Sequence, residues 1–174
     1  MTGTIAVGVS ACLLGEKVRY DGGHKHDSHI TDILGRFFSF VPLCPEVESG
    51  MSVPREAMRL EGKPENPRLV TIEGRVDMTV RMLSYCRIKL EELERMDLCG
   101  FILKARSPSC GLSVDVFGDA APSGKGSGLF AAALSARFPH LPVEEESVLG
   151  DPEERADFIA RVFACHSCNL RQNL

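Results

Sequence analysis

The chain has 174 residues, with 20 basic and 24 acidic side chains that give a net charge of -4. It has no basic tract to neutralise a phosphate backbone, which argues against nucleic acid as the main partner. No apolar run approaches the roughly 20 residues that span a bilayer, and the start of the chain lacks the regions of a signal peptide, so we expect no membrane partner and a cytoplasmic location. The length is typical of one domain, and we expect a single domain over residues 1–174.

Short apolar runs that stop at polar loops predict the strands. The first run, residues 4–10, is rich in β-branched residues and ends just before Cys12. The second, residues 37–43, ends at Cys44, and a third, residues 99–104, runs into a turn that carries Cys110. Further strands are expected at residues 68–72, 114–117 and 142–145.

Segments between these runs predict helices. The clearest covers residues 77–96, with Asp77 as the expected N-cap and Val80, Leu83, Leu90 and Leu93 as the expected buried face. We also expect a short helix at residues 28–34, an alanine-rich helix that stops near residue 138, and a terminal helix that begins at Asp151 with Pro152 in its first turn. Glycine and proline breaks predict a long surface loop at residues 50–67 and a tight turn at residues 123–128.

Strands that alternate with helices favour parallel pairing through right-handed crossovers. We therefore expect an α/β fold with three layers, in which a mostly parallel sheet has helices on both faces. Open sheets of this kind bind their ligands beyond the carboxyl ends of the strands. The loops that follow the strands are therefore the first place to look for a functional site.

Three of the seven cysteines lie in such loops, namely Cys12, Cys44 and Cys110. If the three strands are parallel, their sulfurs emerge at the same edge of the sheet. Thiolates bind zinc, copper(I) or iron-sulfur clusters, and three protein ligands leave one position open for water or substrate. Clusters are normally completed by four cysteines, so three would leave one iron without a protein ligand. A zinc site remains an alternative, although catalytic zinc usually includes a histidine or a carboxylate.

Polar neighbours of these cysteines suggest catalytic chemistry. Cys44 is followed by Glu46 and Glu48, and a carboxylate beside a metal can orient or deprotonate a water molecule. Cys110 is preceded by Ser107 and Ser109, whose hydroxyls can hold a water or a heteroatom of a substrate. The alternative is that the glutamates are solvated and that the Ser-Pro-Ser segment is only a turn.

Several motifs together identify a family. In order along the chain they are GVSACLLG at 8–15, VRYDGG at 18–23, CPEVESG at 44–50 with Pro54-Arg55, CGFILK at 99–104, SPSCG at 107–111 and GSG at 126–128. With these motifs the chain resembles the family long catalogued as domain of unknown function 523, whose characterised members are 2-thiouracil desulfurases. The resemblance covers most of the chain.

The resemblance implies a 4Fe-4S cluster bound by Cys12, Cys44 and Cys110, with an open iron that captures the sulfur of a small thiolated heterocycle such as 2-thiouracil. Water then replaces sulfur on the carbon without net redox change. Glu46 fits the family's general acid/base, and Ser107 fits the hydroxyl beside it. We expect the substrate to be bound by four further side chains: Asp21, Glu48, Arg55 and Ser109. A protein of this kind also needs the cluster assembly machinery as a partner.

A second class of function stays open, in which an iron-sulfur sensor or electron carrier uses the cluster without converting a thiolated compound. An open iron favours the enzyme, because a carrier gains protection for its cluster from a fourth protein ligand. The Cys165–Cys168 spacing resembles half of a metal or redox site, but no second pair completes it. The glycine-rich residues 123–128 lack the order of a phosphate-binding loop, which leaves an auxiliary contact to the substrate as their functional interpretation.

Overall fold

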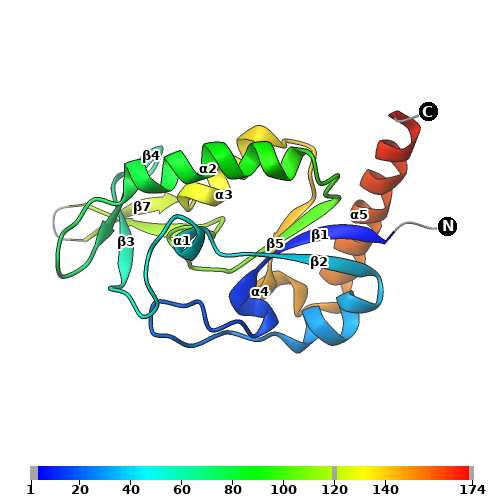
Figure 1. The fold of residues 1–174 in the computed structure, drawn as a ribbon, viewed down its shortest axis with the longest axis horizontal. Coiled ribbons are helices and arrows are strands. Elements are labelled where there is room, and N and C mark those ends of the chain that lie inside the picture. The colour runs from blue at the N-terminus through cyan, green and yellow to red at the C-terminus, as the bar shows by residue number, and fades with distance from the viewer. Residues whose placement is uncertain (1–3, 119–120, 173–174) are drawn as a thin grey trace.

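The computed structural model describes residues 4–118 and 121–172, which form two four-stranded sheets with helices around them (Figure 1). The first sheet has the order β2-β1-β5-β8, and every neighbouring pair in it is parallel. Its strands are β1 (Ile5–Ser10), β2 (Phe38–Leu43), β5 (Gly100–Leu103) and β8 (Val143–Glu145). The α/β architecture expected from the sequence is confirmed.

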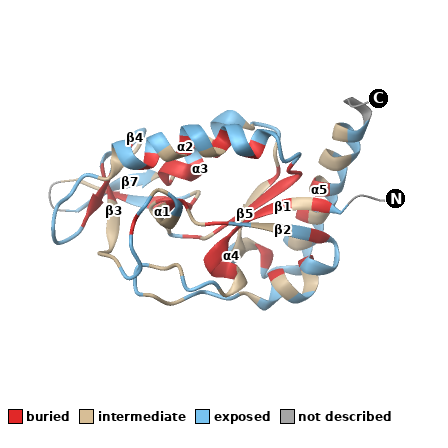
Figure 2. Ribbon diagram, in the orientation of Figure 1, coloured by how far each residue is buried: buried red, intermediate tan, exposed pale blue. Residues whose placement is uncertain are grey.

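The first sheet is the middle of three layers. On one face its side chains pack against α2 (Thr79–Glu94) and α3 (Leu129–Arg137), through Phe101, Leu90 and Phe130 among others. On the other face they pack against α5 (Pro152–Gln172), α4 (Glu146–Leu149) and the short turns η2 (His29–Ile33) and η3 (Leu34–Arg36). Burial follows this arrangement, because the central strands are buried and the outer side of α2 is exposed (Figure 2).

The position of Gly8 in β1 allows β1 and β5 to pair closely. A Cβ at this position would lie 2.2 Å from the ring of Phe101 on β5, far inside van der Waals contact. The ring therefore occupies the space that a side chain on β1 would fill, and Phe101 is fully buried.

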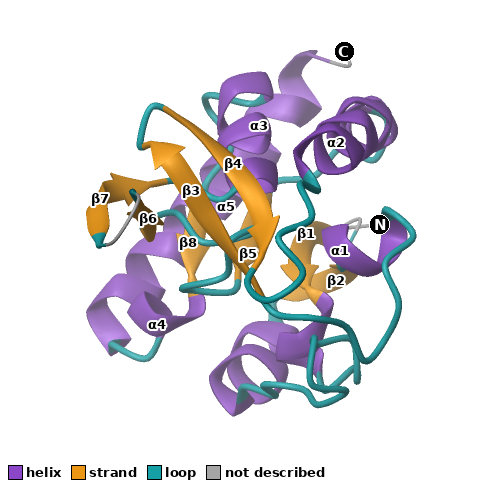
Figure 3. Ribbon diagram, turned by 90° about the vertical axis from the view of Figure 1, so that its left-hand side faces the viewer, coloured by secondary structure: helices purple, strands orange, loops and turns teal. Residues whose placement is uncertain are grey.

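The second sheet was not anticipated. Its order is β4-β3-β6-β7, with one parallel pair, β3 with β6, between two antiparallel pairs (Figure 3). Its strands are β3 (Met58–Lys63), β4 (Asn66–Thr71), β6 (Val114–Phe117) and β7 (Pro122–Gly126). Leu60, Leu69 and Val116 are fully buried in the same cluster as α2, so one core continues from the first sheet to the second.

Two expectations for loops are thereby corrected. Residues 58–63, expected within a long surface loop at residues 50–67, form β3, where the charged side chain of Glu61 pairs with Arg59 and Arg75. The expected tight turn at residues 123–128 is largely β7, the edge strand of the second sheet, where glycine and proline are tolerated.

The expected helices are present, with a different buried face on α2. The residues that α2 buries are Met82, Cys86, Leu90 and Leu93, whereas Val80 and Leu83 are exposed. The spacing of 82, 86, 90 and 93 follows one stripe of the helix, and this stripe packs against α3 and the second sheet. Asp77 accepts a hydrogen bond from the backbone N–H of Thr79, which begins the helix.

The terminal helix α5 begins as expected. Asp151 Oδ1 accepts hydrogen bonds from the backbone N–H groups of Glu153 and Glu154, at 2.8 and 3.2 Å. None of the helices in the described residues is long and apolar enough to span a bilayer.

Candidate metal and active site

The loops that follow three of the parallel strands, β1, β2 and β5, bring their side chains together at one cavity. Cys12 follows β1 in the turn η1 (Ala11–Leu14), Cys44 follows β2, and Cys110 lies in the loop after β5. All three line a cavity of about 460 Å³, together with Glu46, Arg55 and Ser107 among other residues. The expectation that these loops meet at one edge of a parallel sheet therefore matches the observed arrangement.

The three thiols lie in largely water-free surroundings. Cys12 and Cys110 are 8% and 5% exposed. Burial raises the pKa of the Cys12 thiol to about 11 and that of Cys110 well above the ordinary value, and it also raises the pKa of Cys44. The thiols also affect one another, because charge on Cys44 raises the pKa of both Cys12 and Cys110. Near neutral pH the thiols are therefore protonated in the absence of a metal, and a metal has to displace these protons.

The loop that carries Cys110 is held by the amino terminus of α3. The backbone N–H of Phe130 donates to the carbonyl of Ser109 at 2.9 Å, and that of Gly128 donates to the carbonyl of Gly111 at 2.8 Å. A Cβ at Gly128 would lie 2.5 Å from the carbonyl carbon of Ser109. The first amides of α3 are therefore used by the loop, and the glycine-rich segment fixes Cys110 instead of binding a substrate anion.

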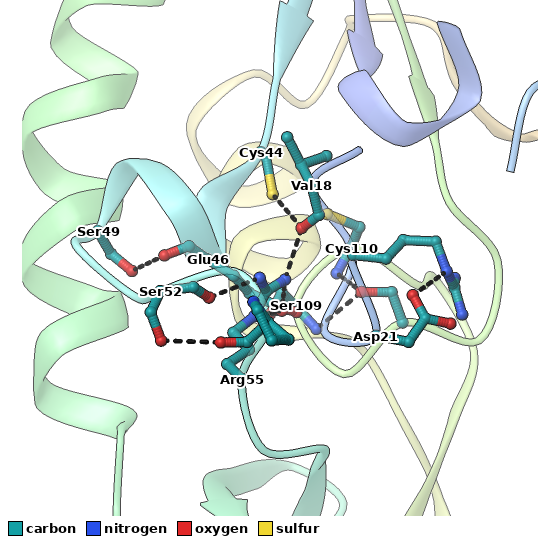
Figure 4. Close-up of polar contacts among 12 residues, drawn as sticks. Val18, Asp21, Cys44, Glu46, Ser49, Ser52, Arg55, Ser109 and Cys110 are labelled. Atoms are coloured by element: carbon teal, nitrogen blue, oxygen red, sulfur yellow. Dashed lines mark hydrogen bonds and ion pairs between the residues drawn. The ribbon is translucent and has the colours of Figure 1, made fainter. Parts of the chain in front are cut away.

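Glu46 is held in the cavity wall by two partners. It is the second residue of α1 (Pro45–Glu48), and its carboxylate forms an ion pair with Arg55, whose Nε lies 2.8 Å from Oε2. The Ser109 hydroxyl donates to the other oxygen, Oε1, at 2.8 Å. Arg55 Nη2 also donates to the carbonyl of Val18 at 2.9 Å, so the carboxylate is tied to two other segments (Figure 4).

The two serines have different positions. Ser107 lines the cavity, and its Oγ accepts hydrogen bonds from the backbone N–H groups of Cys110 and Ser109, at 3.1 and 3.3 Å. A hydroxyl that accepts two bonds still has its own proton to donate. Ser109 is fully buried and is not part of the cavity wall, so it orients Glu46 and does not reach a substrate.

Besides Ser109, two more of the four expected substrate contacts, Asp21 and Glu48, do not line the cavity. Asp21 is exposed and contacts Arg19 and the backbone N–H of Gly23, away from Glu46 (Figure 4). Glu48 points to α2, where it accepts from Tyr85 Oη at 3.0 Å and pairs with Lys89 at 2.9 Å. Its other oxygen accepts from the backbone N–H of Cys44 at 3.0 Å, so it stabilises the start of α1. Its position two residues after Glu46 in a helix turns it to a different side.

The three cysteines offer the donor atoms that soft metals prefer. Thiolates are ligands of iron-sulfur clusters, zinc and copper(I), and the three thiols line one cavity. Within the described residues, no group of three or more His, Cys, Asp or Glu side chains is preformed around a single metal ion.

Comparisons with known proteins agree with this geometry. The family model described as 2-thiouracil desulfurase matches residues 7–146. The chain belongs to the 2-thiouracil desulfurase family. The solved structure of a 4Fe-4S-dependent thiouracil desulfidase, TudS (DUF523Vcz), is similar at 31% identity and a TM-score of 0.69, over 88% of this chain and 97% of that one. No curated protein sequence matches the chain.

One ion pair at the cavity of this family member was not predicted from the sequence. Lys104, at the end of β5, lines the cavity and pairs with Glu146 at the start of α4. Glu146 Oε2 also accepts from the backbone N–H of Ala105 at 2.6 Å. The positive charge of Lys104 lowers the pKa of Cys12 against the larger effect of burial. Lys104 lies in one of the family motifs, but the 42 residues that separate it from Glu146 leave no local signal for the pair.

We predict that Gly128→Ala destabilises the protein, because the added Cβ would collide with the carbonyl group of Ser109. Overpacking of this kind typically costs about 1–3 kcal/mol of unfolding free energy, measurable by denaturant unfolding. Gly150→Ala is the matched control, because a Cβ there meets nothing within 4 Å. Equal stability of the Gly128 and Gly150 variants would contradict the close packing of α3 on the Cys110 loop.

Proposed function

We propose that this chain removes sulfur from a small thiolated heterocycle such as 2-thiouracil, giving the oxo compound and sulfide, with a 4Fe-4S cluster on Cys12, Cys44 and Cys110. The observation that carries the proposal is the meeting of three thiols, two buried and one half-buried, with a fixed carboxylate in one cavity. Membership of the desulfurase family and the likeness to a 4Fe-4S-dependent desulfidase support it.

The donor set suits this cofactor. Thiolates are the usual ligands of iron-sulfur clusters, and the sulfurs of Cys12, Cys44 and Cys110 line one cavity. When bound, the cluster supplies an iron without a protein ligand, at which the substrate sulfur can bind. The cluster assembly machinery then becomes a necessary partner of the chain.

The reaction exchanges C=S and H₂O for C=O and H₂S, so no electrons enter or leave. The protein has to move protons: two leave the attacking water in the course of the reaction, and two are delivered to the departing sulfur. Glu46 is the group for this role, because its carboxylate lines the cavity and is held at both oxygens. Each carboxylate oxygen has further lone-pair capacity beyond the bonds to Arg55 and Ser109, so it can still accept a proton.

The neighbouring residues orient the substrate and Glu46. The Ser107 hydroxyl can donate to a heteroatom of the ring or to the incoming water, while the loop amides hold its oxygen. Arg55 and Ser109 fix Glu46, so that little reorganisation is needed when a proton moves. A sensor or electron carrier would have no use for a carboxylate and a hydroxyl held beside the cluster, which is why we favour the enzyme.

The direct test is anaerobic reconstitution followed by incubation with 2-thiouracil. The loaded protein should release sulfide and form uracil in equal amounts, without an added reductant or oxidant. Serine at Cys12, Cys44 or Cys110 should abolish iron incorporation, because each removes one ligand. Cys168→Ser is the control, since Cys168 is exposed on α5 and outside the cavity. Loss of iron from the Cys168 variant would show that the ligand set is wrong.

Glu46→Gln should keep its iron but lose turnover. A positioned acid/base contributes on the order of 10² to 10⁴ in rate, and the amide can neither accept nor return the proton. Sulfide release at saturating 2-thiouracil measures the loss, and visible absorbance measures the cluster. Glu48→Gln, two residues away but turned to α2, should reduce turnover far less. Near-normal turnover in the Glu46 variant would remove it from the mechanism.

A further inference from the structure

The wall of the cavity is strongly basic. Among its lining residues only Glu46 is acidic, whereas five are basic: Arg19, Lys25, Arg55, Lys104 and Arg106. Three of the five have an acidic partner, because Arg19 lies 3.5 Å from Asp21, Arg55 pairs with Glu46, and Lys104 pairs with Glu146. Lys25 and Arg106 form no ion pair within the described part of the chain. The cavity therefore has two positive charges that the protein itself does not balance.

Arg106 is also held in a strained backbone conformation. Its φ is +59°, in the left-handed region that L-residues other than glycine rarely adopt. Such strain persists only where the surrounding structure enforces it, and it gathers at functional sites. Arg75, at φ +56°, is a useful comparison, because Glu61 binds its guanidinium group. Arg106 has a similar backbone conformation, but it is an exposed residue of the cavity lining, and its side chain forms no hydrogen bond among the described residues.

We propose that Arg106, aided by Lys25, binds the negative charge of the substrate, so that the enzyme takes the deprotonated, anionic form of the thio-heterocycle. This inference rests on the proposed function. A ring N–H beside a thiocarbonyl is acidic, because the charge left by the proton is shared with the sulfur. The anion gains a charge-assisted hydrogen bond from a guanidinium group, which the neutral ring does not.

Binding of the anion also suits the chemistry of the site. Negative charge on the sulfur makes it more like a thiolate, the kind of ligand that iron in such clusters prefers. Arg106 lies on the loop that leads to Ser107 and Cys110, so the charge is recognised next to the proposed hydroxyl donor. The alternative is that Arg106 balances the charge of the three thiolates, and the two roles give different results when Arg106 is replaced.

The test compares two sulfur-free pyrimidines as competitive inhibitors of the reconstituted enzyme: uracil, which is neutral at the assay pH, and barbiturate, which is an anion. The wild type should bind the anion more tightly, and Arg106→Gln should weaken anion binding about tenfold or more while changing uracil binding little. Arg106→Lys should keep most of the preference. The maximal turnover of 2-thiouracil should change much less than its KM.

Two control variants distinguish binding of the anion by Arg106 from a contribution of Arg106 to the stability of the fold. Arg75→Gln removes the charge of the other strained arginine, outside the cavity, and should leave the preference for the anion unchanged. Arg106→Gly removes both strain and charge, so it should lose the preference without a lower thermal midpoint than Arg106→Ala. A residue kept only for structure would show the reverse pattern, with lost stability and intact preference.

The inference is overturned if the wild type does not prefer the anion, or if Arg106→Gln keeps the preference. It is also overturned if Arg106→Gln loses iron but still prefers barbiturate, because the charge then serves the thiolates. Binding of a fluorescent anionic pyrimidine by the loaded protein, displaced by the two inhibitors, gives the same comparison without turnover. Failure of the wild type to release sulfide from 2-thiouracil would instead refute the proposed function, and the binding preference would still be measurable.

Discussion

The candidate site depends on the parallel pairing of β1 with β2 on one side and with β5 on the other. Parallel strands end at the same edge, so the loops after them have to meet. Ile5 pairs with Phe38 and Ser10 with Leu43, which keeps Cys12 and Cys44 two residues and one residue beyond the same rung of the sheet. A slip of the register by one residue would turn the side chains of a strand to the other face and separate the two thiols.

Burial keeps the three thiols protonated in the absence of a metal and shields their bonds to a metal once it is bound. Water-free surroundings disfavour the thiolate form, as the raised pKa values of Cys12, Cys44 and Cys110 show. The same surroundings protect metal–thiolate bonds once the protons have been displaced. Positive charge from Lys104 and Arg19 favours the Cys12 thiolate, and that from Arg55 favours the Cys44 thiolate. The basic residues of the cavity wall thus favour the thiolate form of the proposed ligands, in addition to the proposed binding of an anionic substrate.

The sequence predicts the parts of the fold that depend on local pattern. A β-branched run identifies β1 and an apolar run identifies β5, and a proline in the first turn with an aspartate before it marks the start of α5. β3 could not be predicted, because its glutamate, arginine and glycine are typical of loops, and one of the two arginines that pair with the buried Glu61, Arg75, lies outside the strand. The buried stripe of α2 was also missed in part, because the partners that cover Met82 and Cys86 come from tertiary packing.

The ends of the parallel strands predicted the position of the cavity, whereas nearness in sequence to a cysteine did not predict which residues line it. The loops after the strands correctly located the cavity, but they did not tell which of two neighbouring glutamates faces it. Glu46 and Glu48 lie on the same short helix, and only the positions of Arg55 and Lys89 decide their directions. Asp21 shares a family motif with residues of the cavity wall and still lies outside it. Glu146, which pairs with Lys104, follows directly after β8. The three residues of β8 carry no motif that predicts a functional site.

We propose that three thiolates of this chain hold a cluster with one distinct iron. Mössbauer spectroscopy of protein reconstituted anaerobically with ⁵⁷Fe can detect that iron, because the method distinguishes irons by their ligands. The signal from one iron in four should change when 2-thiouracil is added, while the signals of the other three should not. Four equivalent irons, or a spectrum that 2-thiouracil leaves unchanged, would contradict it.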